Sequence, residues 1–192
     1  MPKLGMEPIR RAALVKATIA AVGEAGHLDV TVGGIARRAG MSPALAHHYF
    51  GSKDDIFLAA MRHILSLYSA EVRARVKAAR TPRERLEAII RGSFAAENFA
   101  AETVTAWLVF YVRALGDAGA RRLLAIYHRR LRSNLLHALR PLAGDRAGAL
   151  ADDLGALIDG CYLRAALGGA PDGAGEAARV LRALDGALGP GR

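Results

Sequence analysis

The sequence contains a single cysteine, Cys161, among 192 residues, so no disulfide can form within the chain. Proteins of oxidising compartments often depend on disulfides, and a chain without them favours a reducing compartment. The first residues hold no apolar segment of signal-peptide length, and no uncharged apolar run approaches the ~18 to 20 residues needed to span a bilayer. We therefore expect a cytoplasmic protein with no membrane partner.

Recognisable catalytic motifs are also missing: there is no nucleophile elbow, no phosphate-cradling glycine loop and no His and Glu at zinc-site spacing. The best catalytic material is the adjacent pair Asp152 and Asp153, whose carboxylates point apart on a helix. The adjacent His47 and His48 also do not share a helix face, and no third ligand lies at metal-site spacing. We predict that the chain is not an enzyme and has no catalytic residues, no metal and no cofactor.

Acidic residues are scarce relative to basic ones. The sequence has 18 Asp and Glu against 27 Lys and Arg, which gives a net charge of +9 and a pI near 10.4. This excess favours a polyanionic partner such as nucleic acid. A helical scaffold or a membrane-surface protein is an alternative use of the same charge, but such a protein is expected to have one amphipathic basic face.

The chain is rich in Ala, Leu and Arg and has few β-branched runs, which predicts an all-α fold of about nine helices. Glycine, proline and capping residues mark the breaks between these helices. The predicted helices cover approximately 8–25, 32–39, 43–50, 52–79, 82–99, 102–115, 117–140, 145–167 and 173–188. Proline is expected to end the seventh helix before Pro141.

Two short helices are predicted between about Thr31 and Phe50, joined by the sequence AGMS. Gly40 suits a left-handed helix end, and Ser42 can cap the next helix. Around that second helix, one side carries Leu45, Ala46, Tyr49 and Phe50, and the other carries Pro43, Ala44, His47 and His48. One side can pack while the other stays free, as in a helix-turn-helix whose second helix enters the major groove of DNA.

Candidate DNA contacts follow from this arrangement. Small residues at the start of the second helix allow close approach to base edges, while helix N-termini and basic side chains hold phosphates. The candidates are Ser42, Pro43, Ala44 and His47 for base edges, Thr31, Arg37, Tyr49 and Lys53 for the DNA backbone, and Arg10 or Arg11 for the backbone or the minor groove. Arg37 could instead belong to a solvated face.

A candidate ligand site begins with Trp107, Phe110 and Tyr111, which share one helix stripe at i, i+3 and i+4. Aromatic rings with one carboxylate are what a quaternary ammonium ion requires, because the cation is attracted to ring faces. The other candidates are Phe94, Asn98, Tyr127, Asp159 and Tyr162. Two alternatives remain: the rings could be plain core, and Asp159 could cap a helix or pair with Arg164 or Arg113.

The stretch TVGGIARRAGMSPALAHHYFGSKDDIF resembles the DNA-binding domain of TetR-type repressors. The resemblance implies a DNA-binding domain over residues 1–51, a ligand-binding and dimerisation domain over 52–192, and a homodimer on a palindromic operator. It also implies a small-molecule effector. We expect the helix that follows Ser52 to act as the lever between ligand and DNA, and the last two helices to form the dimer.

The stretches TAWLVFY, HRRLRSNL and LIDGCYLR are similar to the BetI-type branch of this family. That likeness implies a repressor of genes for glycine betaine synthesis that is released by choline or a related compound. Cys161 and Tyr162 stand where this branch commonly has Leu-Trp, so a different cationic or aromatic ligand is the alternative.

Overall fold

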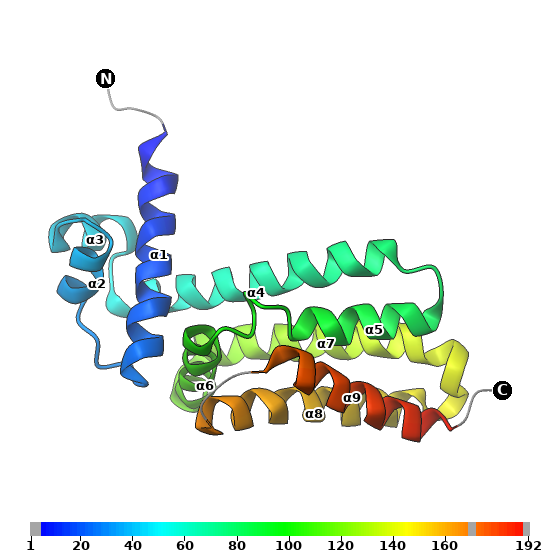
Figure 1. Ribbon diagram of the computed structural model, residues 1–192. Helices are drawn as coiled ribbons and strands as arrows, with labels where there is room; N and C mark the ends of the chain where they lie inside the picture. The colour runs from blue at the N-terminus through cyan, green and yellow to red at the C-terminus, as the bar shows by residue number, and fades with distance from the viewer. Residues whose placement is uncertain (1–4, 169–171, 190–192) are drawn as a thin grey trace.

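A computed structural model describes residues 5–168 and 172–189, which form nine α-helices and one short 3-10 helix (Figure 1). The helices are α1 (Met6–Ala25), α2 (Val32–Arg38), α3 (Pro43–Phe50), α4 (Lys53–Ala78), α5 (Pro82–Ser93), α6 (Ala101–Gly116), α7 (Ala118–Ala143), η1 (Gly144–Arg146), α8 (Ala147–Gly168) and α9 (Gly173–Leu188). The predicted all-α class is confirmed. No helix in the described residues combines the length and apolar character needed to cross a membrane.

The ends of the two short helices are set by local hydrogen bonds. The Thr31 hydroxyl accepts from the Gly34 N–H at 3.1 Å, and the Ser42 hydroxyl accepts from the Leu45 N–H at 3.2 Å. Gly40 lies between them with φ +68°, a left-handed conformation that glycine adopts without steric cost. The predicted turn and both predicted caps are confirmed.

The predicted end of α5 is wrong. This helix ends at Ser93 rather than near Phe99, because the Asn98 side-chain amide donates to the Gly92 carbonyl at 3.0 Å. In a continuing α-helix the backbone N–H four residues further on would donate to this carbonyl, and the Asn98 side chain donates in its place. Phe94 and Asn98 consequently lie in the turn before α6 and are not an i, i+4 pair on a helix.

The predicted end of α7 is also wrong, since this helix runs through Pro141 to Ala143. Proline removes only its own N–H from the helical ladder, and near a helix end few further bonds depend on it. The helix closes with the Gly144 N–H donating to the Arg140 carbonyl.

Figure 1 shows α1, α2 and α3 grouped at one end of the molecule, from which α4 runs along the rest of the bundle. In this three-helix unit Leu14, Ile35 and Ala46 are fully buried, one from each helix. α1 packs most extensively on α6, so α6 lies between the three-helix unit and the bundle. α8 and α9 lie on the side of the bundle away from α4 (Figure 1).

Candidate functional site

One face of α3 is free of packing. Pro43, Ala44, His47 and His48 are exposed, whereas Tyr49 on the opposite side is buried. The imidazole of His47 is held by a hydrogen bond between its Nδ1 and the Gly51 carbonyl at 2.9 Å. The two-sided division predicted for this helix is therefore present, with small residues and imidazoles on the free side.

Basic side chains surround this face. The Arg10 guanidinium donates to the Tyr49 hydroxyl at 3.4 Å, so the end of the buried Tyr49 ring is tied to α1. Lys53, at the start of α4, places its ammonium group 5.6 Å from the centre of the Phe57 ring. On α2, Arg38 pairs with Glu24, whereas Arg37 and the capping residue Thr31 are exposed. A positively charged rim thus borders the free face of α3.

A cavity of about 290 Å³ lies between α6 and α8. A cavity of about 150 Å³ holds a benzene molecule, so this one has room for a small organic ligand. The Trp107 ring lies 5.7 Å from Tyr111 and 6.5 Å from Tyr162, centre to centre. The cavity is lined by Trp107, Leu108, Tyr111, Asp159, Gly160, Tyr162 and Leu163. Its wall is mostly apolar, and Asp159 supplies the carboxylate.

The Asp159 side chain, 24% exposed, is held by two groups of α7. The Tyr127 hydroxyl donates to Oδ1 at 3.1 Å, and Nε2 of His128 lies 3.1 Å from Oδ2. The alternative pairings of this carboxylate are wrong: Arg113 pairs with Asp54 at 2.7 Å, and no ion pair to Arg164 occurs within residues 5–168 and 172–189.

The phenols around Asp159 are neutral donors. Burial, followed by the charge of neighbouring Asp159, raises the pKa of Tyr111 far above its ordinary value. Burial likewise raises the pKa of Tyr127 well above its ordinary value. Their hydroxyl protons therefore remain in place at neutral pH, and these residues add no charge to the cavity.

Tyr162 is fixed from behind the cavity. Its hydroxyl donates to the Ser93 carbonyl at the end of α5, while its ring meets the edge of Phe99 at 4.9 Å and stacks on Phe94 at 5.9 Å. Phe94 and Asn98, both predicted to line the ligand site, instead support this ring and the turn below it. Neither residue lines the cavity between α6 and α8: Phe94 borders a groove with Gly173 and Ala177 of α9, and Asn98 lines a void of about 20 Å³ together with Trp107, Tyr127 and Tyr162.

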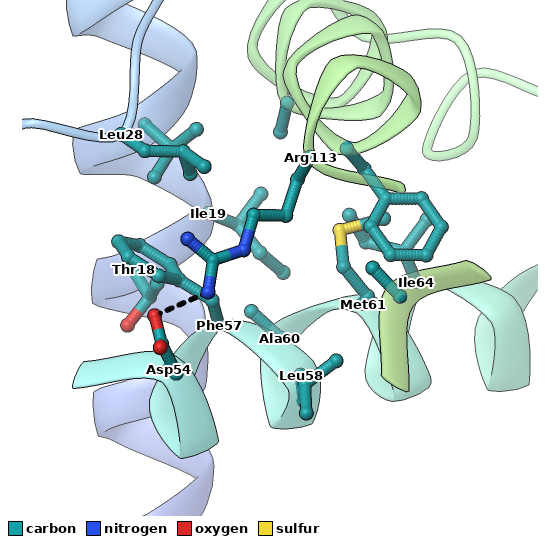
Figure 2. A pocket seen from close by; sticks show the side chains of 14 residues that line it. Thr18, Ile19, Leu28, Asp54, Phe57, Leu58, Ala60, Met61, Ile64 and Arg113 are labelled. Carbon is teal, nitrogen blue, oxygen red and sulfur yellow. Dashed lines mark ion pairs between the residues drawn. The ribbon is translucent and has the colours of Figure 1, made fainter. Parts of the chain in front are cut away.

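Phe110, also predicted as a ligand contact, does not line this cavity, although its ring lies 5.6 Å from the Trp107 ring, centre to centre. It faces α1 and α4 across an apolar junction whose remaining void is only about 30 Å³. Figure 2 shows this junction with Phe57 and Met61 of α4, and with Arg113 of α6 reaching Asp54 in the first turn of α4. α6 therefore presents Trp107 and Tyr111 to the cavity, and Phe110 and Arg113 to α1 and α4.

The same helix touches α1 very closely at its other end. A Cβ placed on Gly23 would lie 2.6 Å from the Glu102 carbonyl oxygen and 2.7 Å from its Cα, well inside van der Waals contact. Only a residue without a side chain allows this approach. α6 is thus joined to α1 at one end, through Gly23, and to the first turn of α4 at the other, through the ion pair between Arg113 and Asp54.

The sequence-based interpretation missed His128, as well as Tyr68, whose ring meets the Tyr127 ring edge-on at 5.5 Å. It also missed the lining residues Leu108 and Leu163. No local spacing signals the contact of His128 with Asp159, because the two residues lie on different helices. The position of His128 directly after a candidate aromatic residue was the only available hint.

Comparison with known proteins identifies the family. Residues 14–60 match the model of bacterial regulatory proteins of the tetR family, and residues 82–189 match the BetI-type transcriptional repressor C-terminal model. The HTH-type transcriptional regulator BetI of Brucella melitensis biotype 2 is 53% identical over 182 residues, covering 94% of this chain and 92% of the relative.

Solved structures share the fold. A TetR transcription regulator from Haloarcula marismortui superposes with a TM-score of 0.83 at 19% identity, covering 94% of this chain and 98% of the other. A transcriptional regulator from Saccharomonospora viridis, solved in complex with choline, gives a TM-score of 0.81 at 22% identity, covering 91% of this chain and 94% of the other.

These matches bear on several predictions. TetR-type proteins are transcriptional regulators rather than enzymes, so the prediction of no enzyme activity is confirmed. Regulators of this type bind operator DNA and small-molecule effectors. The chain belongs to the TetR family of DNA-binding transcriptional repressors, with a C-terminal domain of the BetI type.

Proposed function

We propose that this repressor controls genes that convert choline to glycine betaine, and that choline or a related quaternary ammonium compound releases it from its operator. The observation that carries this proposal is the cavity between α6 and α8, which the rings of Trp107, Tyr111 and Tyr162 line together with Asp159. The names of its BetI relatives and the choline complex of the Saccharomonospora viridis protein support it.

The chemistry of the cavity suits this class of ligand. A quaternary ammonium ion has no N–H to donate, so it is recognised by the negative faces of aromatic rings and by nearby negative charge. Trp107 and Tyr162 are almost fully buried, so their rings are desolvated and such attraction is strongest there. The single carboxylate balances the ligand charge without requiring a hydrogen bond from it.

For DNA recognition we propose that residues 1–51 form the reading domain and residues 52–192 the ligand-binding and dimerisation domain. The free face of α3, with Ser42, Pro43, Ala44 and His47, enters the major groove. The rim contacts phosphates through Arg10, Thr31, Arg37 and Lys53, and through the hydroxyl of Tyr49 where Arg10 holds it. This function places the protein in the cytoplasm together with its operator.

Two copies are needed to read a palindromic operator, and we assign the homodimer to α8 and α9. Both helices lie on the side of the bundle away from α4 (Figure 1). On α8, Leu163 and Leu167 are 46% and 75% exposed, and a second copy would cover them. Light scattering on the Leu167→Asp variant tests this assignment: a dimer of unchanged stability would contradict it.

The route from ligand to DNA passes through α6. Ligand packed against Trp107 and Tyr111 shifts this helix, and Arg113, two residues further on, holds Asp54 at the start of α4. α4 follows directly from α3, so its first turn sets the position of the recognition helix. The release requires only that the ligand bind better to the arrangement in which the two α3 helices miss successive major grooves.

Choline titration of the purified protein tests the proposal. Trp107 is the only tryptophan and lines the cavity, so the intrinsic tryptophan fluorescence comes from a residue of the proposed site. We expect a saturable change with choline, and at least about tenfold weaker binding in Asp159→Asn, which corresponds to ~1.4 kcal/mol. The matched control is Asp152→Asn, which removes an exposed carboxylate from the same helix outside the cavity. Equal effects of the two variants would contradict the assigned site.

A different cationic or aromatic ligand is the second candidate, favoured by the largely apolar wall that Leu108 and Leu163 provide. A choline titration that is silent by fluorescence and by calorimetry, in a protein that still binds duplex DNA with a steep salt dependence, would favour this alternative. In that case the operator-binding function stands and the effector changes.

A further inference from the structure

His128 lies where it can compete with a cationic ligand. Its Nε2 is 3.1 Å from Oδ2 of Asp159, on the α7 side of the carboxylate, whereas the cavity lies on the other side between α6 and α8. Its side chain is 44% exposed, so protons reach it from solvent. A ligand in the cavity and the imidazole of His128 therefore approach the same carboxylate from two directions.

The competition concerns charge and not space. A quaternary ammonium ion donates no hydrogen bond, so it does not need the lone pairs that Tyr127 and His128 occupy. It needs the negative charge of Asp159. With neutral His128 the pair carries one negative charge, and with protonated His128 the pair is neutral and the ligand loses its electrostatic partner.

We propose that His128 is a proton-controlled competitor of the effector: when protonated it neutralises Asp159 and weakens binding of a cationic ligand, and when neutral it yields the carboxylate to the ligand. The inference rests on the proposed cation site. It assigns to His128 a role in setting ligand affinity, with no part in contacting the ligand itself.

One carboxylate and two phenols lie against the His128 imidazole. From α6 it is faced by the Tyr111 hydroxyl at 3.3 Å, and from α8 by Asp159. Burial raises the pKa of Tyr111, so this phenol stays neutral when histidines titrate. On α7 itself Tyr127 precedes it and is neutral for the same reason. Arg129 and Arg130 follow on the exposed surface, and Arg132, one turn on, is paired with Asp152 of α8.

Choline affinity measured by calorimetry from about pH 5.5 to about pH 8, the range in which histidine changes charge, tests the inference. In the wild-type protein the dissociation constant for choline is expected to fall as pH rises, by up to about tenfold per pH unit. The uncharged carbon analogue of choline, with carbon in place of nitrogen, should show no such dependence. Choline binding at the acidic end should also release a proton, which titrations in two buffers of different ionisation enthalpy detect.

His128→Gln keeps an N–H donor for Asp159 but cannot become charged. We expect its choline affinity to be independent of pH and, at the acidic end, tighter than that of the wild type. His137→Gln is the matched control, since His137 is an exposed histidine of the same helix that contacts Arg85 rather than Asp159. This variant should retain the wild-type pH dependence.

The outcomes separate the two proposals. If choline binds the wild type with an affinity that does not change with pH, or if His128→Gln behaves as the wild type does, the competitor role is wrong and the choline site stands. If neither protein binds choline at any pH in this range, the cation site is wrong and the role of His128 falls with it.

Discussion

Gly23→Ala isolates the close contact between α1 and α6. Gly23 lies inside α1, where alanine is the better helix former by ~1 kcal/mol, so helix propensity alone predicts a more stable protein. The tertiary contact predicts the opposite. The added Cβ would lie 2.6 Å from the Glu102 carbonyl oxygen, and ordinary contact begins near 3.4 Å, so the two helices must separate by about 0.8 Å.

The clashing atoms belong mainly to backbone, which cannot rotate out of the way. Overpacking of this kind costs about 1 to 3 kcal/mol, and after the gain in helix propensity we expect a net loss of about 1 kcal/mol. For a chain of this size the loss lowers the midpoint of thermal unfolding by ~2 to 4 °C. Thermal and urea unfolding followed by circular dichroism at one fixed protein concentration measure it, because dimerisation makes apparent stability depend on concentration.

Gly33→Ala is the matched control. Gly33 lies in the short helix α2, where a Cβ would meet only the Pro43 ring at 3.9 Å, an ordinary contact. Without a clash, the propensity term acts alone and the variant should be more stable by up to ~1 kcal/mol. If Gly23→Ala proves as stable as Gly33→Ala, the close approach of α1 to α6 does not limit the residue at position 23, and the reasoning is refuted.

Four further predictions follow from individual contacts. Asp54→Asn removes an ion pair that is about half exposed, so the free energy of unfolding should change by less than ~1 kcal/mol. The choline concentration that releases a fluorescently labelled operator from the protein should nevertheless change, because the ion pair links α6 to α4. An unaltered release curve contradicts the route through α6. Ser42→Ala removes the N-cap of α3 and should lower the free energy of unfolding by ~1 kcal/mol, measured by thermal unfolding. An unchanged free energy of unfolding would mean that the cap does not contribute to stability. Tyr162→Phe loses the hydrogen bond to the Ser93 carbonyl, so urea unfolding should show a loss of stability of ~1 kcal/mol. The ring remains, so choline affinity measured by calorimetry should be nearly unchanged. A large loss of affinity would mean that the hydroxyl contacts the ligand. Burial, with the Glu176 carboxylate nearby, raises the pKa of the Cys161 thiol to about 12, so the reactive thiolate is scarce below that pH. A thiol reagent should therefore label the native protein far more slowly than the unfolded protein. Equal labelling rates would refute this prediction.

The helix boundaries near the N-terminus could be predicted from the sequence because their causes are local. Thr31 and Ser42 bond to N–H groups three residues away, and Gly40 needs only its own left-handed conformation. The free face of α3 follows from helical periodicity in the same way. Where the cause was not local, prediction failed: α5 ends early because Asn98, beyond the helix, takes the Gly92 carbonyl.

The candidate ligand site shows the same division. Residue types and helical spacing were enough to single out Trp107, Tyr111, Asp159 and Tyr162, since aromatic rings and a carboxylate on apolar helices are visible in the sequence. Spacing within one helix does not say which neighbouring helix each side chain will face, so the sequence did not show that Phe110 lines the junction with α1 and α4 and not the cavity next to α8.

The sequence by itself therefore determined the all-helical class, the turn between α2 and α3 and the residue types available for recognition, because hydrogen bonds and periodicity within a few residues decide these. Only the tertiary structure decided that Asp159 meets His128 and that Arg113 meets Asp54. These contacts depend on how helices distant in sequence pack together, and packing of the whole core sets that arrangement.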